Sequence, residues 1–311
     1  MKITVIGAGN VGATCANVIA HKALANQIVL VDVKEGLAEG KALDMWQTAS
    51  VNIFDTRIIG VTNDYLATKG SEIIIITSGV PRKPGMSRDD LIATNAKIVK
   101  EVTQKAIKYS PDAIIIVVSN PLDVMTYAAY LTANKDHRKV FGMAGILDAA
   151  RYKSFIAETL NTSPRDVQAL LLGGHGDTMV PLPRYTSVSG IPVSQLLNQE
   201  EIDKIVQKTR QGGGDLVKLI GTSAWYAPGA AVALMVEAIA HDQHRIFSIC
   251  AYLNGEYGLK DIYLGVPVKL GRTGVEEVIE VELDKDEKKL LNDSANAVRE
   301  LKKTLDDMNL F

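Results

Sequence analysis

The stretch of sequence that decides the fold is ITVIGAGNVG at residues 3–12. Its first four residues are mostly apolar and β-branched and predict a buried strand, and its three glycines form a G-x-G-x-x-G turn. The segment ATCANVIA at 13–20 predicts a helix, and residues 27–31 predict a second strand that ends at Asp32. Strand, glycine turn, helix, strand and terminal acid follow one another as in a dinucleotide-binding βαβ unit.

Each part of this turn has a physical reason. Gly7 allows the tight turn out of the strand, Gly9 lets the backbone approach a pyrophosphate, and Gly12 lets the helix pack near the sheet. The helix N-terminus offers free N–H groups to the phosphates. Asp32 can accept hydrogen bonds from both adenosine ribose hydroxyls and would repel a 2′-phosphate, so NAD is expected rather than NADP. The alternative is a tight strand–helix turn with an incidental acid. The residues expected to contact the cofactor here are Gly7, Ala8, Gly9, Asn10, Val11, Gly12 and Asp32.

Composition and charge limit the function classes. The chain has 311 residues, which favours about two domains, and its net charge of −2 provides no basic field for nucleic acid. The longest apolar runs, such as 73–76 and 113–118, are too short to span a bilayer, and no signal peptide is expected before the first strand. Cys15 and Cys250 lie in apolar segments and are expected to be reduced core residues, as in a cytoplasmic protein.

The first half of the chain alternates strands and helices up to residue 144. The β-branched runs at 73–77 and 113–118 predict buried parallel strands, and the sequence therefore predicts a doubly wound parallel sheet. Ligands of such sheets lie at the carboxyl ends of the strands. The glycine turn, Asp32, the Pro/Gly loop at 78–88 and the segment 119–121 all fall there.

The pattern changes near residue 145. We therefore expect two domains, an NAD-binding α/β domain over 1–144 and an α+β domain for catalysis and substrate over 145–311. In the second we expect a helix at 148–159, a strand at 167–172, a long helical stretch at 216–243 broken at Pro228, antiparallel strands at 247–253, 261–269 and 274–281, and a final helix that begins with a capping box of Asp284 and Glu287.

Three residues of the second half could form a catalytic site. His175 follows an apolar strand and lies between glycines, so its imidazole would be reachable and could exchange a proton with a hydroxyl or carbonyl. The alternative is an exposed turn histidine. Asp148 and Arg151 are spaced i, i+3 and share a helix face, as a surface ion pair would. In the functional interpretation Asp148 orients His175 and Arg151 binds a carboxylate bidentately.

Further candidates lie on loops of the first half. Arg82 and Arg88 are on the Pro/Gly loop, which is either a solvated basic loop or a lid that brings two cations over an anionic substrate. Asn120 precedes a proline at a strand end and could orient a substrate hydroxyl, or it is a turn residue. No metal site is visible, because His244 and Cys250 do not have a ligand spacing, and no Walker or G-x-S-x-G motif occurs.

Together these pieces resemble the malate dehydrogenases, in the branch most similar to the lactate dehydrogenases. The segments that carry the resemblance are GAGNVG, LVD, SGVPRKPGMSRDDL, VVSNPLD, GILDAAR and GGHGDTMVP, which extend through nearly the whole chain. The resemblance implies NAD-dependent interconversion of (S)-malate and oxaloacetate, a step of the tricarboxylic acid cycle. It also implies a homo-oligomer. The related enzymes are dimers or tetramers, and because this sequence lacks the N-terminal arm of larger relatives, both a homodimer and a homotetramer stay open.

The resemblance assigns roles to individual residues. The proton-exchanging histidine matches His175 and its partner matches Asp148. The carboxylate-binding arginine matches Arg151, and the carbonyl-polarising arginine of the mobile loop matches Arg88. The remaining matches are Asn120 for substrate and cofactor, Asn95, Val118 and Ser119 for NAD, and, less closely, Ser223 for the substrate pocket.

Arg82 is the position that separates substrates in this resemblance. Similar lactate dehydrogenases have glutamine there, and an arginine implies a second substrate carboxylate, as in malate. A lactate dehydrogenase is therefore the nearest alternative. An NAD-dependent glycosidase would need a metal-binding Cys/His arrangement that the sequence lacks. A non-catalytic NAD-sensing module would leave His175 and the three arginines without a purpose.

Overall fold

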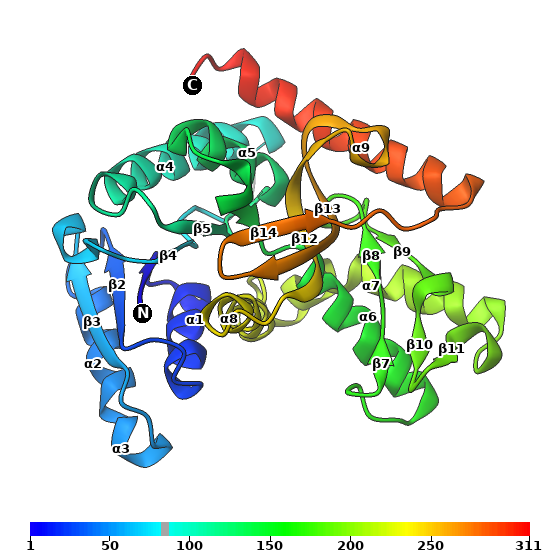
Figure 1. The fold of residues 1–311 in the computed structure, drawn as a ribbon, viewed down its shortest axis with the longest axis horizontal. Helices are drawn as coiled ribbons and strands as arrows, with labels where there is room; N and C mark the ends of the chain where they lie inside the picture. Colours follow the sequence, from blue (N-terminus) through cyan, green and yellow to red (C-terminus); the bar gives the residue numbers. More distant parts are fainter. Residues whose placement is uncertain (82–86) are drawn as a thin grey trace.

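The computed structural model describes residues 1–81 and 87–311, which fold around one large sheet (Figure 1). Nine strands of these residues form it, in the order β14-β13-β12-β6-β5-β4-β1-β2-β3. The six strands of the first half, in the sheet order β3-β2-β1-β4-β5-β6, pair in parallel. This is the strand order of a doubly wound nucleotide-binding sheet. The bounds of these strands are β1 Lys2–Ile6, β2 Gln27–Asp32, β3 Arg57–Thr62, β4 Ile73–Ile76, β5 Ile114–Val117 and β6 Val140–Gly142.

The parallel strands are apolar along their length because both faces of the sheet are covered. Ile73 and Ile75 of β4 point into the core that contains α1 and α8, whereas Ile74 and Ile76 point into the core of α4 and α5. Figure 1 shows α4, α5 and α9 on one side of the sheet and α1 and α8 on the other. The helices that flank the parallel strands are α1 Asn10–His21, α2 Leu37–Gln47, α3 Ala49–Asn52, α4 Arg88–Tyr109 and α5 Leu122–Ala133.

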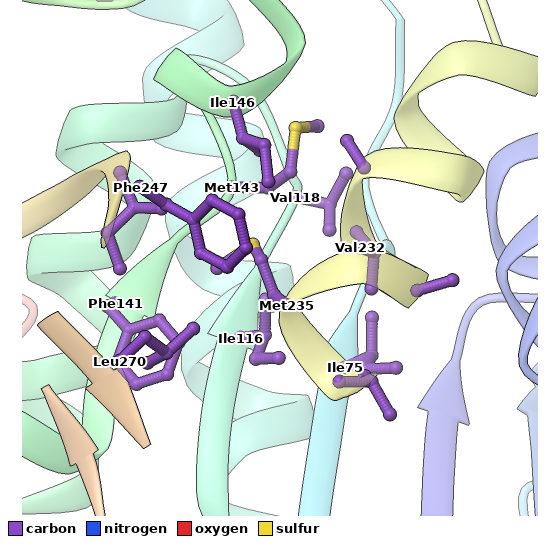
Figure 2. Packing of buried hydrophobic residues seen from close by; sticks show 14 of the residues in the cluster. Ile75, Ile116, Val118, Phe141, Met143, Ile146, Val232, Met235, Phe247 and Leu270 are labelled. Carbon is purple, nitrogen blue, oxygen red and sulfur yellow. The ribbon is translucent and has the colours of Figure 1, made fainter. Parts of the chain in front are cut away.

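The second half of the chain extends the same sheet with antiparallel strands. These strands are β12 (Arg245–Asn254), β13 (Lys260–Gly271) and β14 (Gly274–Val278), and β12 joins β6 through the pair Cys250 and Gly142. The predicted antiparallel strands are confirmed. Figure 2 shows Val232 and Met235 of helix α8 packed over sheet side chains of both halves, so one core joins the two parts of the sheet.

The expected strand at 167–172 is wrong as a single element. Val167–Gln168 is β7, which pairs with β10 (Ser187–Val188), and Leu171–Leu172 is β8, which pairs with β9 (Val180–Pro181). The apolar pattern was continuous, but the chain changes partner strand between these dipeptides. Strand β11 (Ile191–Pro192) completes the small sheet that contains β7.

The helices of the second half are α6 Gly145–Leu160, α7 Gln199–Ile220, α8 Tyr226–Ala240 and α9 Lys285–Asp307. The expected helix break at Pro228 is wrong. The break comes earlier, because Gly221 has a φ of 73° and ends α7, and Pro228 lies in the first turn of α8, where no N–H is needed. The capping box of Asp284 and Glu287 at the start of α9 is confirmed. Among the helices of residues 1–81 and 87–311, none has the length and apolar character that crossing a membrane requires.

Candidate active site

Two neighbouring cavities open at the carboxyl ends of the parallel strands. The first is lined by Gly9, Asp32 and the beginning of the Pro/Gly loop, together with apolar side chains of α2 and α4. The second is lined by Val11, Asn120 and residues of α6, α7 and the turn after β8. Helix α1 contributes to both cavities through its N-terminal region, so a ligand that spans them would pass the helix N-terminus.

The glycine turn has the geometry that the sequence predicted. Gly7 has a φ of 106°, which L side chains rarely adopt, and a Cβ on Gly12 would lie 1.8 Å from the carbonyl oxygen of Gly7. A Cβ on Gly9 would meet no atom within 4 Å, so the backbone there is open to a ligand. These observations fit a pyrophosphate at the N-terminus of α1.

Asp32 is held in place at the end of β2 by two backbone donors. The N–H of Ala8 donates to Asp32 Oδ2 at 2.6 Å, and the N–H of Lys34 donates to Oδ1 at 2.9 Å. Each carboxylate oxygen keeps a further lone pair for a hydroxyl. With apolar walls from residues such as Leu37 and Ile98, the cavity fits the adenosine half of a dinucleotide.

In the second cavity, His175 lies against a carboxylate that is distant in sequence. His175 Nδ1 and Asp148 Oδ2 are 2.8 Å apart, and Arg151 Nη1 donates to Asp148 Oδ1 at 3.2 Å. Asp148 is buried, whereas His175 and Arg151 retain some exposure at the cavity wall. The structure therefore brings together the imidazole, its acidic partner and a guanidinium.

The glycines next to His175 differ from each other in their surroundings. A Cβ on Gly173 would lie 2.7 Å from Ser294 Oγ, and one on Gly174 would lie 2.8 Å from Val298 Cγ2. Gly173 and Gly174 therefore let the turn pack against α9, whereas we expected the glycines beside His175 to make its imidazole reachable. Only Gly176, of the three, has no atom within 4 Å of an added Cβ.

The pKa of the His175 imidazole is raised above its ordinary value. Burial alone would lower this pKa, because the charged ring loses solvation. The charge of Asp148 and its hydrogen bond raise the pKa, the carboxylate of Asp123 raises it further, and Arg151 opposes them. The net result favours the protonated ring.

Asp123, in the first turn of α5, is a second carboxylate behind the histidine. The backbone N–H of His175 donates to Asp123 Oδ2 at 3.0 Å, and Oδ1 has no hydrogen-bond partner among the described residues. Burial raises the pKa of the Asp123 carboxyl, and hydrogen bonds from the Cys250 thiol and from His175 partly offset this rise. The motif VVSNPLD contained Asp123, but nothing in the sequence indicated that it lies behind His175.

Comparison with known proteins identifies the family. Residues 1–142 match the lactate/malate dehydrogenase NAD binding domain, and residues 146–311 match the lactate/malate dehydrogenase alpha/beta C-terminal domain. The chain belongs to the lactate/malate dehydrogenase family. It is therefore an oxidoreductase, and NAD is its cofactor.

The chain is similar along nearly its whole length to malate dehydrogenases and lactate dehydrogenases of other organisms. Malate dehydrogenase from Cytophaga hutchinsonii is 58% identical over 308 residues, which are 99% of each chain. The structure of malate dehydrogenase from Salinibacter ruber is 56% identical with a TM-score of 0.95, covering 99% of this chain and 98% of that one. The lactate dehydrogenase from Cryptosporidium parvum complexed with lactic acid and the dinucleotide is 39% identical with a TM-score of 0.94, covering 98% of each chain.

Some of the other predicted site residues line the second cavity, and one is buried behind the start of the Pro/Gly loop. Asn120, Val118 and Ser223 line the second cavity. Asn95 is buried, and its side chain bonds to both backbone groups of Val80 and to the carbonyl of Asn120, so it ties the start of the Pro/Gly loop to a neighbouring strand end.

Ser119 and the two loop arginines complete the predicted set. The hydroxyl of Ser119 donates to the carbonyl of Ser78 at 2.6 Å. Arg88 is exposed at the first position of α4 and is not among the described residues that line either cavity. Arg82 lies outside the described residues.

Two basic residues, Lys41 and Arg210, lie near the cavities although nothing in the sequence indicated that they belong to the site. Lys41 Nζ donates to the carbonyl of Ala8 at 2.8 Å and so holds the glycine turn from α2. Arg210 of α7 lines the cavity of His175. Each lies in a helix whose pattern is that of an ordinary amphipathic helix, so only the folded chain reveals their positions.

A group of metal-ligand type lies elsewhere. Asp242, His244 and Glu276 form the one cluster of three such side chains within the described part of the chain. It lies just beyond the C-terminal end of α8, whereas the cavity of His175 adjoins the first turn of that helix. Since α8 has 15 residues, it separates the two places by about 22 Å.

Proposed function

We propose that the chain catalyses the reversible oxidation of (S)-malate to oxaloacetate with NAD. The observation that carries this proposal is the 2.8 Å contact between His175 Nδ1 and Asp148 beside the guanidinium of Arg151. It combines a proton-exchanging group with a carboxylate-binding group in one cavity. The malate dehydrogenases that share more than half of the sequence favour malate over lactate.

In this proposal His175 moves one proton. Asp148 fixes Nδ1, so Nε2 is the ring nitrogen left to take the hydroxyl proton of malate or to return it to the carbonyl of oxaloacetate. The carboxylate of Asp148 then stabilises the imidazolium. Bound NAD supplies the acceptor for the hydride.

Arg151 is proposed to bind the carboxylate next to the reacting carbon. Its Nη1 donates to Asp148, and its Nη2 has no hydrogen-bond partner among the described residues, so a donor remains for an incoming carboxylate. Asn120 at the cavity wall is proposed to orient the substrate hydroxyl. From the Pro/Gly loop, we propose that Arg88 polarises the reacting carbon–oxygen bond and that Arg82 binds the second carboxylate.

For the cofactor we propose contacts from both cavities. Residues 7–12 would hold the pyrophosphate and Asp32 the adenosine ribose, with Asn95, Val118, Ser119 and Asn120 along the remaining path. We also propose the division into an NAD-binding domain at 1–144 and a catalytic domain at 145–311. The match of separate family models to residues 1–142 and 146–311 supports it.

One assay tests the function. NADH oxidation is followed with oxaloacetate and then with pyruvate, in the presence of a chelator. We expect fast turnover of oxaloacetate and at least about 10²-fold lower catalytic efficiency with pyruvate. Pyruvate has no second carboxylate, so it would leave Arg82 enclosed without an anionic partner, which is costly. Preference for pyruvate would indicate a lactate dehydrogenase, and NADH binding without turnover would indicate a sensing module.

We also propose that the protein is a cytoplasmic homo-oligomer, either a dimer or a tetramer. The apolar surface of α2 and α3 supports an interface between copies, since Leu43, Val51 and Ile53 are exposed there. The mass of the native protein in solution measures the subunit number.

A further inference from the structure

Arg210 is an arginine of the substrate cavity that has no role in the function proposed above. It lies on α7, partly buried, and its Nε donates to the carbonyl oxygen of Met179 at 3.2 Å. Met179 itself lines the cavity and belongs to the turn that follows His175. The guanidinium is therefore fixed by the turn that carries the histidine and cannot move freely like a surface side chain.

The charge of Arg210 is uncompensated within the described part of the chain. Its partner through Nε is a neutral carbonyl, and no carboxylate of the described residues lies within ion-pair distance of it. Arg151, by contrast, has Asp148 at 3.2 Å. Asp177 also lines the cavity, but it is exposed and forms no ion pair with Arg210. A fixed guanidinium without an anionic partner is a binding group for an anionic ligand.

Helix α7 places this charge next to Arg151. Residues 210, 213, 214 and 217 line the cavity, and this spacing puts them on one helix face. A Cβ on Gly213 would lie 3.7 Å from Arg151 Nη1, so Arg151 contacts the helix one turn after Arg210. Positions i and i+3 of a helix are about 5–6 Å apart at their Cβ atoms. Two guanidinium groups therefore share one wall of the cavity, and the single carboxylate of Asp148 lies between Arg151 and His175.

From this geometry we propose that Arg210 is a further specificity-determining residue that attracts the second carboxylate of a dianionic substrate. This inference rests on the proposed oxidation of malate. A monoanionic acid needs only Arg151, whereas a C4 dicarboxylate brings a second charge that Arg210 can meet from the helix. Because Arg210 belongs to α7, its position does not depend on the Pro/Gly loop.

The test compares Arg210→Gln with wild type and with Lys204→Gln. Lys204 lies on the same helix but pairs with Glu200 at the surface, so its loss removes the same charge away from the cavity. For Arg210→Gln we expect kcat/KM for oxaloacetate to fall by roughly 10- to 100-fold, mainly through KM. The efficiency with pyruvate and the Kd for NADH, measured by fluorescence, should stay within about twofold. Lys204→Gln should match wild type in all of these measurements.

Arg210→Lys and the salt dependence separate charge from packing. Lysine keeps the charge, so it should restore part of the oxaloacetate efficiency without changing the pyruvate value. Raising the salt concentration should lower the oxaloacetate efficiency of wild type more steeply than that of Arg210→Gln. The ratio of the two substrates is measured on the same folded molecules, so partial unfolding does not obscure it.

Several outcomes would overturn the inference. An equal loss with both substrates, or a lower kcat at unchanged KM, would mean that Arg210 only holds the turn at Met179. Equal efficiencies of Arg210→Gln and wild type would mean that it contributes nothing to substrate choice. If wild type itself fails to prefer oxaloacetate, the proposed function is wrong, and this result does not depend on any Arg210 variant.

Discussion

His175 depends on two carboxylates that contact it in different ways. Asp148 accepts from the ring and sets which nitrogen faces the cavity, whereas Asp123 accepts from the backbone N–H and anchors the turn. Both raise the pKa of the ring against the effect of burial. The histidine can therefore hold a proton at a pH where a free imidazole would have lost it.

The first prediction concerns Asp148→Asn. An amide lacks the charge that raises the pKa of His175, so the apparent pKa of the enzyme–NADH complex for binding oxaloacetate should fall. KM for oxaloacetate, which binds the protonated enzyme, should then begin to rise at a lower pH than in wild type, and turnover should drop. The pH profiles of KM in the two proteins are the measurement, and superimposable profiles would contradict the assignment.

The same raised pKa affects folding. A histidine with a higher pKa in the folded state stabilises the fold fully below its unfolded pKa of about 6.5, and this contribution is lost as the pH rises through the folded pKa. We therefore expect the free energy of unfolding to lose this contribution above the folded pKa, and His175→Asn should remove this part of its pH dependence. Urea unfolding of wild type and His175→Asn, at pH values from below 6.5 to above the folded pKa, measures whether the stabilisation decreases as the pH rises.

A third residue-scale prediction concerns cofactor choice. Asp32 accepts from two backbone N–H groups, which fixes its carboxylate where a ribose would lie. Asp32→Ala should raise the Kd for NADH by about tenfold or more, because hydrogen bonds to a charged acceptor are lost. The Kd for NADPH should rise less or fall, since repulsion of the 2′-phosphate is gone. Comparable catalytic efficiency of wild type with both cofactors would show that Asp32 does not select between them.

The sequence predicted the local part of this site and missed the part made by folding. The i, i+3 spacing of Asp148 and Arg151 indicated their contact, which is present. His175 and Asp148 are 27 residues apart, so no local spacing indicated their pairing, which was a functional interpretation that the family resemblance supported. Asp123 and Arg210 were missed because no local pattern distinguishes a buried carboxylate or a cavity arginine from a helix residue of ordinary kind.

At the scale of elements, α7 contains the run Gly212-Gly213-Gly214 in its interior. Each glycine costs a helix up to about 1 kcal/mol relative to alanine. Gly212 and Gly213 face Arg151, whose Cδ and Nη1 would lie 3.5 and 3.7 Å from their added Cβ atoms, whereas Gly214 would meet nothing within 4 Å. A methyl group on Gly212 or Gly213 would therefore contact Arg151, whereas one on Gly214 would not.

This contrast gives an element-scale prediction. Gly214→Ala should stabilise the protein by about 0.5–1 kcal/mol and should raise KM for oxaloacetate less than Gly213→Ala, because its methyl group contacts no atom of Arg151. Gly213→Ala should also favour the helix, but its methyl group covers part of the Arg151 guanidinium and should raise KM. Thermal unfolding and steady-state kinetics of both variants measure the two effects. Equal KM values would show that the wall of α7 does not limit access to Arg151.

The elements themselves were predictable where local signals agree. The apolar strands, the glycine turn and the capping box at Asp284 lie where the sequence indicated. The helix break was misplaced, because Pro228 is tolerated in a first helical turn and Gly221 ends the preceding helix. The division of residues 167–172 between two sheets depends on partner strands, which a local pattern does not specify.

At the scale of the whole molecule, one sheet crosses both halves of the chain. Strand β12 of the second half joins β6 of the first, and α8 packs on the sheet core beside both. The cavities therefore lie on a continuous scaffold. The sequence predicted each set of strands, but their connection depends on the pairing of Cys250 with Gly142, for which the sequence gives no signal.

The last prediction concerns the apolar surface of α2 and α3. Ile53 is 89% exposed and has a φ of 54°, a conformation that is costly for a β-branched residue. An isolated chain would gain nothing from isoleucine here, since aspartate tolerates this conformation better and is well solvated. Val51, next to it, is 78% exposed. These costs are offset if the surface is buried against a second copy, where each large apolar side chain contributes about 1.5–3 kcal/mol.

Ile53→Asp should therefore reduce the subunit number while leaving each subunit folded. The mass by light scattering should fall toward 33.6 kDa at micromolar concentration, and circular dichroism should show the same helix and strand content. Leu66→Asp is the matched control, because Leu66 is also exposed but lies outside α2 and α3, and its mass should equal that of wild type. A wild-type chain that is already monomeric, or an Ile53→Asp variant with unchanged mass, would show that the exposed isoleucine does not lie in a subunit interface.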